Sequence, residues 1–325
     1  MQGYLGLDVG SVSTNLVIID ENDNLLASSY LRTRGQPIRA VQEAIKKTGS
    51  EIPSDLKIAG VGSTGSARRL AGVIAGADTV KNEITAHAVA ANHVVPGVQT
   101  VLEIGGQDSK IIILRGGIVV DFAMNTVCAA GTGSFLDHQS QRLNIPIEEF
   151  GHLALKSEHP VRIAGRCSVF AESDMIHKQQ TGHDLADIIA GLSEALVRNY
   201  LNNVGKGKDI QAPIVFQGGV AANQGIKAAF ARALQKDITI PPHYDVMGAL
   251  GAALIAKRVM AGNNQPSRFL GFELGDFKYD ATSFECQDCP NSCEIVNIMV
   301  EGELLARWGS RCGQWDQLEE KRTGT

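Results

Sequence analysis

Positive charge and long apolar runs are both scarce in this chain. The 30 Lys and Arg residues are outnumbered by 35 Asp and Glu residues, giving a formal net charge of -5 and no sign of a basic surface for nucleic acid. No apolar run reaches the length that spans a membrane, and residues 4–7 read as a strand rather than as part of a secretory leader. We therefore expect a cytoplasmic protein that binds neither nucleic acid nor membrane.

Cysteine is absent from the first part of the chain, since all six cysteines lie at or beyond Cys128. Thiols clustered in this way in a reducing compartment indicate metal binding rather than disulfides. With 44% hydrophobic and 20% charged residues the sequence is typical of a globular protein, and 325 residues exceed the size of one compact core. We expect two lobes.

An acid followed by a small-residue turn occurs twice in a strand–turn–strand pattern, at residues 5–20 and 100–113. Aligned as a weak internal repeat, Glu103 falls on Asp8 and Gly105 falls on Gly10. A carboxylate beside exposed backbone N–H groups suits a phosphate with its Mg²⁺, and two such hairpins face to face could clamp the phosphates of a nucleotide. Each turn taken alone could equally be an ordinary hairpin.

Two further glycine-rich segments follow. A buried strand at 212–216 leads into a loop at 217–223 whose glycines would let a base or ribose lie against the backbone, although a strand-to-helix turn explains them too. Residues 244–253 read as a helix of small residues suited to close packing or to hinge movement. Further helices are predicted at 38–47, 83–94, 134–143, 147–155, 168–180 and 184–201.

Two cysteines each lie just before a predicted helix. Cys128 precedes the helix at 134–143, and Cys167 precedes the helix at 168–180. Free N–H groups and the positive dipole end of a helix stabilise a thiolate, the form that binds metal. A [4Fe–4S] cluster normally takes four protein ligands, so two cysteines per chain would be completed by a two-fold homodimer. The alternative is that both are small buried packing residues.

The other four cysteines form a cluster near the C-terminus. Cys286, Cys289 and Cys293 follow a C-x2-C-x3-C spacing, and Cys312 comes after two strand-like stretches. Four thiolates suit tetrahedral zinc or an iron–sulfur cluster. The sequence leaves open whether this second metal site is a structural zinc staple or a second electron site.

Several motifs occur together, in order, over about residues 3–260. They are Asp8-Val9-Gly10-Ser11, Ile104-Gly105-Gly106-Gln107-Asp108 and the segments at 128–133 and 167–173. The chain thereby resembles the ATPase activators of 2-hydroxyacyl-CoA dehydratases, a group that includes ATPase subunits of benzoyl-CoA reductases and the reductases of double-cubane-cluster proteins. These belong to the actin, sugar kinase and Hsp70 superfamily.

The resemblance implies an α/β fold of two ribonuclease-H-like lobes, at 1–96 and 97–262, with a cysteine-rich extension at 263–325. ATP or ADP with Mg²⁺ would lie between the lobes. The implied catalytic and metal-handling residues are Asp8, Glu103, Gln107 and Asp108. The implied nucleotide contacts are Gly10, Ser11, Val12, Ser13, Gly105, Gly106, Gly218, Gly219, Asn223 and Gly248.

The resemblance also implies a function. One [4Fe–4S] cluster, bound by Cys128 and Cys167 of both subunits of a homodimer, would pass electrons to an iron–sulfur acceptor enzyme at the expense of ATP. A ferredoxin or flavodoxin would be the low-potential donor. Two alternatives remain: a small-molecule kinase on the same fold, for which no motif identifies a substrate pocket, and a nucleotide-gated assembly module with a zinc-bound tail.

Overall fold

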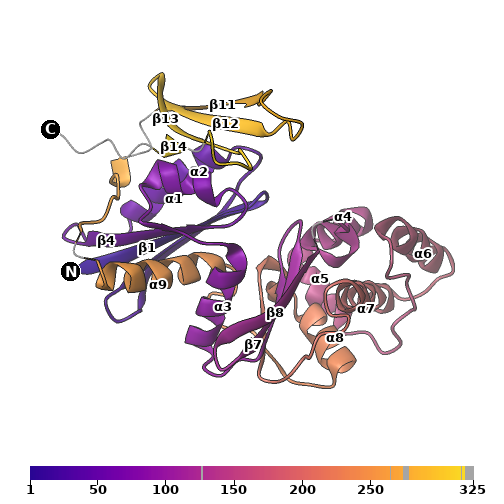
Figure 1. Ribbon diagram of the computed structural model, residues 1–325. Coiled ribbons are helices and arrows are strands. Elements are labelled where there is room, and N and C mark those ends of the chain that lie inside the picture. Colours follow the sequence, from indigo (N-terminus) through magenta and orange to yellow (C-terminus); the bar gives the residue numbers. More distant parts are fainter. Residues whose placement is uncertain (126, 264, 274–277, 316, 319–325) are drawn as a thin grey trace.

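The computed structural model describes residues 1–125, 127–263, 265–273, 278–315 and 317–318. It contains two five-stranded sheets, ordered β3-β2-β1-β4-β5 and β8-β7-β6-β9-β10, in two lobes (Figure 1). The first sheet comprises β1 (Gln2–Val9), β2 (Ser13–Asp20), β3 (Leu25–Arg32), β4 (Lys57–Thr64) and β5 (Thr79–Val80). The second comprises β6 (Thr100–Ile104), β7 (Ser109–Arg115), β8 (Ile118–Asn125), β9 (Ile214–Gln217) and β10 (Ile238–Thr239).

The two sheets have the same topology. In each, three antiparallel strands are followed by two parallel ones, so β6 to β10 repeat the arrangement of β1 to β5. The register places Asn15 opposite Asp8 in the first hairpin and Lys110 opposite Glu103 in the second. The predicted α/β fold of two similar lobes is confirmed, and the repeat extends from a short motif to an entire sheet.

Helices cover the faces of the sheets. They are α1 (Pro37–Gly49), α2 (Arg68–Ala75), α3 (Glu83–Val94), α4 (Gly133–Leu143), α5 (Ile147–Ala154), α6 (Ser168–Gln180), α7 (Leu185–Asn203), α8 (Gln224–Leu234) and α9 (Met247–Ala261). The helices predicted at 83–94 and 168–180 are confirmed to the residue, whereas α8 was not predicted. Within the described residues, no helix combines the length and apolarity needed to cross a membrane.

Helix α9 follows the second sheet in sequence but packs on the first sheet, beside β1 and β4 (Figure 1). The close contact depends on glycine: a Cβ atom at Gly6 of β1 would overlap the carbonyl oxygen of Ala249. A Cβ atom at Gly251 would likewise overlap the carbonyl oxygen of Ala86 in α3. Helix α9, which comes after the second sheet in sequence, therefore packs against the strand that begins the chain. The domain boundaries at residues 96 and 262 stay predictions.

A small antiparallel sheet forms the C-terminal end of the described chain. Its strands are β11 (Tyr279–Glu285), β12 (Glu294–Val300), β13 (Glu303–Trp308) and β14 (Gln317–Leu318). This tail sheet lies beside α1 and α2 of the first lobe (Figure 1). Phe269, Phe272 and Tyr279 pack against the core of that lobe and so anchor the tail to it.

We predict that Gly251→Ala lowers the free energy of unfolding by about 1–3 kcal/mol, because the added methyl group forces α9 away from α3. Gly262→Ala is the matched control, since its Cβ atom would meet no atom closer than 3.9 Å. Urea unfolding of both variants measures the difference. Equal stabilities would show that the close packing of α9 on α3 contributes nothing.

Candidate functional site

Two adjoining cavities open between the lobes, with volumes of about 180 and 230 Å³. Both acid–glycine hairpins line the smaller cavity, through Asp8, Gly10, Ser11, Val12, Ser13, Glu103, Gly105, Gly106, Gln107 and Asp108. Gly218 also lines the smaller cavity, and Asn223 lines the larger one. Because Val12, Tyr30 and Gly219 contribute to both, the two cavities form one elongated site that can take a phosphate chain and its nucleoside.

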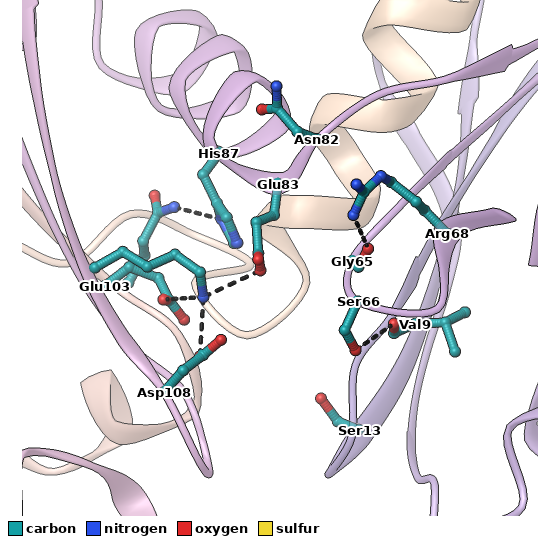
Figure 2. Close-up of polar contacts among 12 residues, drawn as sticks. Val9, Ser13, Gly65, Ser66, Arg68, Asn82, Glu83, His87, Glu103 and Asp108 are labelled. Atoms are coloured by element: carbon teal, nitrogen blue, oxygen red, sulfur yellow. Dashed lines mark hydrogen bonds and ion pairs between the residues drawn. The ribbon is translucent and has the colours of Figure 1, made fainter. Parts of the chain in front are cut away.

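Three carboxylates converge on one buried lysine in the smaller cavity. The Lys110 Nζ atom lies 2.9 Å from Glu103 Oε2, 2.9 Å from Asp108 Oδ1 and 3.2 Å from Glu83 Oε2 (Figure 2). Sequence reasoning missed Lys110 and Glu83. The signal for Lys110 was the hairpin itself, because a residue directly opposite Glu103 on an antiparallel partner strand shares its face.

The charges of this cluster are unbalanced. Burial raises the pKa of Asp8 to about 7, with Lys110 opposing the rise and Glu83 and Asp108 adding to it. Burial also raises the pKa of Glu103. For Lys110, burial acts to lower the pKa, but the negative charges of Glu103, Asp108 and Glu83 outweigh it and the pKa is raised. Four carboxyl groups facing one ammonium group leave an excess of negative charge that a divalent cation can balance.

His87 of α3 is a neutral member of the same cavity. Burial, and then the charge of Lys110, lower its pKa to about 3. The Gln217 side-chain Nε2 donates a hydrogen bond to Nδ1 of His87 at 2.8 Å, which places the ring proton on the other nitrogen. Sequence reasoning interpreted His87 as an ordinary helix residue and did not assign it to the site.

Gly218 and Asn223 line the cavities, whereas Gly248, which was also predicted to contact the nucleotide, is not among the lining residues and packs against Asp8. Gly218 has a φ of 88°, and a Cβ atom there would overlap the carbonyl oxygen of Ile104. A Cβ atom at Gly248 would overlap the Asp8 carboxylate, so glycine lets α9 begin against that group. The Asn223 Oδ1 atom accepts from Ile226 N at 3.1 Å, while its buried Nδ2 atom has no protein partner within the described chain. That amide can donate to a ligand.

The loops that carry Cys128 and Cys167 contact each other, and each cysteine directly precedes a helical segment. Cys128 precedes a 3-10 turn at Ala129–Gly131, and Cys167 precedes α6. Asn199 of α7 joins their loops, because its Nδ2 atom donates to Gly165 O at 2.6 Å and lies 3.8 Å from Cys128 Sγ. Cys128 Sγ is also 4.0 Å from Arg166 O. Thr126, part of the loop expected to carry Cys128, lies outside the described residues.

Hydrogen bonds connect the cysteine loop to the second hairpin. Gly133 N donates to Gly105 O at 2.9 Å, and both the backbone N and the Oγ atom of Ser134 donate to Gly106 O, at 2.8 and 2.6 Å. On the other side of Cys128, its N–H donates to Asn125 Oδ1 at 2.9 Å, at the end of β8. The segment that carries Cys128 is therefore held at one end by the second acid–glycine hairpin and at the other by the end of β8.

All six cysteines are free thiols. Among the described residues, no three His, Cys, Asp or Glu side chains are gathered as a metal-binding group. Cys286, Cys289, Cys293 and Cys312 lie in two loops of the tail sheet. Both metal sites, the cysteine pair and the tail cluster, therefore stay predictions.

Two sheets of one topology, facing each other across a cleft lined with carboxylates and phosphate-type turns, define a two-lobed nucleotide-binding protein of the actin and sugar kinase type. Residues 5–256 match the model of the BadF/BadG/BcrA/BcrD ATPase family, and the chain belongs to this family.

Similar proteins include the (R)-2-hydroxyglutaryl-CoA dehydratase activating ATPase of Acidaminococcus fermentans, 36% identical over 265 residues that cover 79% of this chain and 98% of that protein. The crystal structure of component A of that organism's dehydratase superposes with a TM-score of 0.73 at 33% identity, covering 80% of this chain and 100% of the other. The activator of 2-hydroxyisocaproyl-CoA dehydratase from Clostridium difficile, with bound ADPNP, gives 0.70 at 33% identity, with coverage of 80% and 96%. Each of these comparisons covers about four fifths of this chain.

We predict that Mg²⁺ binding in the presence of ADP weakens as pH falls, because we propose that ionised Asp8 helps to hold the cation and its pKa is raised to about 7. Below that pH the Asp8 contribution should fall about tenfold for each pH unit. Titration calorimetry between about pH 5.5 and 8 measures it. Asp8→Asn is the control, since it retains the titration of ADP itself. Identical pH profiles for both proteins would contradict the assignment.

We also predict that Lys110→Met destabilises the nucleotide-free protein by about 3 kcal/mol at pH 8, because carboxylates then lie buried without their cation. At pH 6 the loss should be smaller, since carboxyl groups with a raised pKa, such as Asp8 and Glu103, become neutral. Urea unfolding at both pH values checks this. The exposed Lys206→Met is the control, with an expected change within about 0.5 kcal/mol. An equal loss at the two pH values would argue against carboxylate repulsion as the cause.

Proposed function

We propose that this protein is an ATP-dependent electron-transfer protein that activates a partner iron–sulfur enzyme. A [4Fe–4S] cluster bound by Cys128 and Cys167 of two subunits would supply one-electron chemistry at low potential. The acceptor would be an enzyme of the 2-hydroxyacyl-CoA dehydratase or double-cubane type, and the donor a ferredoxin or flavodoxin. The names of the similar proteins, which are activators of such dehydratases, support this choice of acceptor.

The observation that carries the proposal is the pairing of two partly exposed thiols. Asn199 bonds to the loop of Cys167 and contacts the sulfur of Cys128, so one side chain fixes both loops. Two thiols at helix starts fit half of a four-cysteine ligand set. They are too few to complete it, which requires a second copy of the chain.

Apolar side chains surround this pair and favour a homodimer. Val127, Val169 and Phe170 are 95%, 66% and 66% exposed, and each lies within three residues of one of the two cysteines. Large apolar groups gathered at one exposed place typically mark an interface. In a two-fold dimer the same patch meets itself, which brings both cysteine pairs to the symmetry axis.

The nucleotide site supplies the energy. We propose that Asp8 and Asp108 hold Mg²⁺ or its water ligands and that Glu103, already paired with Lys110, reaches the metal through water. Gln107 would orient the attacking water, while the glycine turns hold phosphates and Gly218, Gly219 and Asn223 hold adenosine. ATP favours whichever lobe arrangement binds it more tightly, and this difference in affinity is the free energy available to the cysteine loops.

The path from nucleotide to cysteines is short. The Gly106 carbonyl accepts two hydrogen bonds from Ser134, at the start of α4 and six residues beyond Cys128. A change in the turn that holds the phosphates therefore moves a segment covalently continuous with the thiol. Through this linkage, hydrolysis of the nucleotide would control a protein whose output is an electron.

We predict about four irons per dimer in anaerobically prepared protein. Cys128→Ala should lose the iron and the transfer of electrons to an acceptor, while a nucleotide-induced rise in melting temperature shows that ADP still binds. Ser173→Ala, an exposed change on α6 near Cys167, is the control that should retain iron. Metal analysis and low-temperature EPR measure the outcome. Iron-free protein that remains fully active would contradict the proposal, and a phosphorylated small-molecule product would favour the kinase alternative.

A further inference from the structure

The tail sheet lies outside the part of the chain that matches the family. The family match ends at residue 256, whereas β11 begins at Tyr279. Its cysteines take no part in the proposed electron transfer. They occur at Cys286, Cys289 and Cys293, between β11 and β12, and at Cys312, after β13.

The loop between β11 and β12 is a closed hairpin end. Glu285 pairs with Glu294 at the last step of the ladder, and Cys286 N donates to Cys293 O at 2.8 Å. Inside the loop, Ser292 N donates to Cys289 O at 3.2 Å across a β-turn that has Pro at its first central position. These bonds fix the backbone of three cysteines at one end of the sheet.

The loop after β13 packs on this hairpin end. Strand β13 is antiparallel to β12, with Trp308 opposite Val296, so the residues after Trp308 leave the sheet at the same end. Gln314 Nε2 donates to Asp288 Oδ2 at 3.2 Å. Trp315 Nε1 donates to Cys286 Sγ at 3.3 Å. Cys312 lies between Trp308 and these two contacts, so all four cysteines share one end of the sheet.

The tail has little apolar core to hold these loops. Residues of β11 are mostly exposed, and the buried apolar side chains of β12 and β13 are Ile295, Ile298, Val300 and Ala306. Sheets of this size usually need a disulfide or a structural metal in addition to their core. Four cysteines at one end of the sheet can supply such a cross-link by binding a metal.

We propose that Cys286, Cys289, Cys293 and Cys312 bind one zinc ion as four thiolates and that this ion locks the two loops together. Structural zinc sites are tetrahedral, closed sets of four ligands with Zn–S distances of about 2.3 Å. The four thiols are not gathered into a ligand set in the described structure, so binding the ion requires the exposed Cys289 and Cys312 to turn toward the more buried Cys286 and Cys293. The Trp315 N–H bond to Cys286 Sγ is of the kind that orients and stabilises a metal-bound thiolate.

The position of the tail favours zinc over a second electron site. The tail sheet lies beside α1 and α2 of the first lobe, whereas α6, which begins after Cys167, lies at the far edge of the second lobe (Figure 1). A metal in the tail is therefore remote from the cysteine pair. A metal ion in the tail should therefore stabilise the fold of the tail.

The test uses the full-length chain, freed of metal, supplied anaerobically with zinc sulfate and then desalted. We expect one zinc per chain in the wild type and in Ser283→Ala, an exposed control on β11, and at least a tenfold loss in Cys289→Ser and Cys312→Ser. Cys128→Ala should retain the zinc, which separates this proposal from the proposed function. Cobalt in place of zinc should give the intense absorption bands of a tetrahedral four-thiolate site.

A second measurement covers variants that fail to fold. In the wild type, zinc should protect all four tail cysteines from maleimide labelling, as mapped by mass spectrometry, while Cys128 stays reactive in iron-free protein. No zinc in the wild type, undiminished zinc in Cys289→Ser, or unprotected tail thiols would overturn the proposal. Iron that remains in Cys128→Ala and is lost in Cys289→Ser would instead identify a second electron site.

Discussion

The cleft of this protein is organised by buried negative charge. Asp8 and Glu103 are each the last residue but one of their strands, β1 and β6, so folding the two sheets together brings carboxyl groups into one cavity. Lys110 offsets part of that charge and is itself held by three carboxylates. The negative charge that remains unbalanced would favour binding of a magnesium nucleotide, as proposed above.

The same hairpins explain how a nucleotide could act on the cysteines. Gly106 belongs to the phosphate-type turn and also accepts hydrogen bonds from Ser134, while Asn125 and Asn199 hold the loop of Cys128 from its other sides. These contacts connect the loops of the cysteine pair to the cleft. The tail sheet is attached to the opposite lobe and lies outside this chain of contacts.

Local sequence predicted much of this arrangement. The acid–glycine repeat revealed two equivalent hairpins because strand and turn signals are local, and helix α6 was predicted to the residue. Lys110, Glu83 and His87 were missed because they enter the site through cross-strand register and through a helix from the other lobe. The packing of α9 on the first sheet was also hidden, since the glycines that permit it are far apart in sequence.

The central claim is that the identity of the bound nucleotide changes the surroundings of the paired cysteines. The most direct measurement is the EPR spectrum of the anaerobic, reduced protein, compared between Mg·ADP and a magnesium complex of a non-hydrolysable ATP analogue. The account predicts that the spectrum differs between the two nucleotides and that Ser134→Ala, which removes one of the bonds to Gly106, diminishes the difference. Identical iron–sulfur spectra in both nucleotide states, with binding of each nucleotide verified, would contradict it.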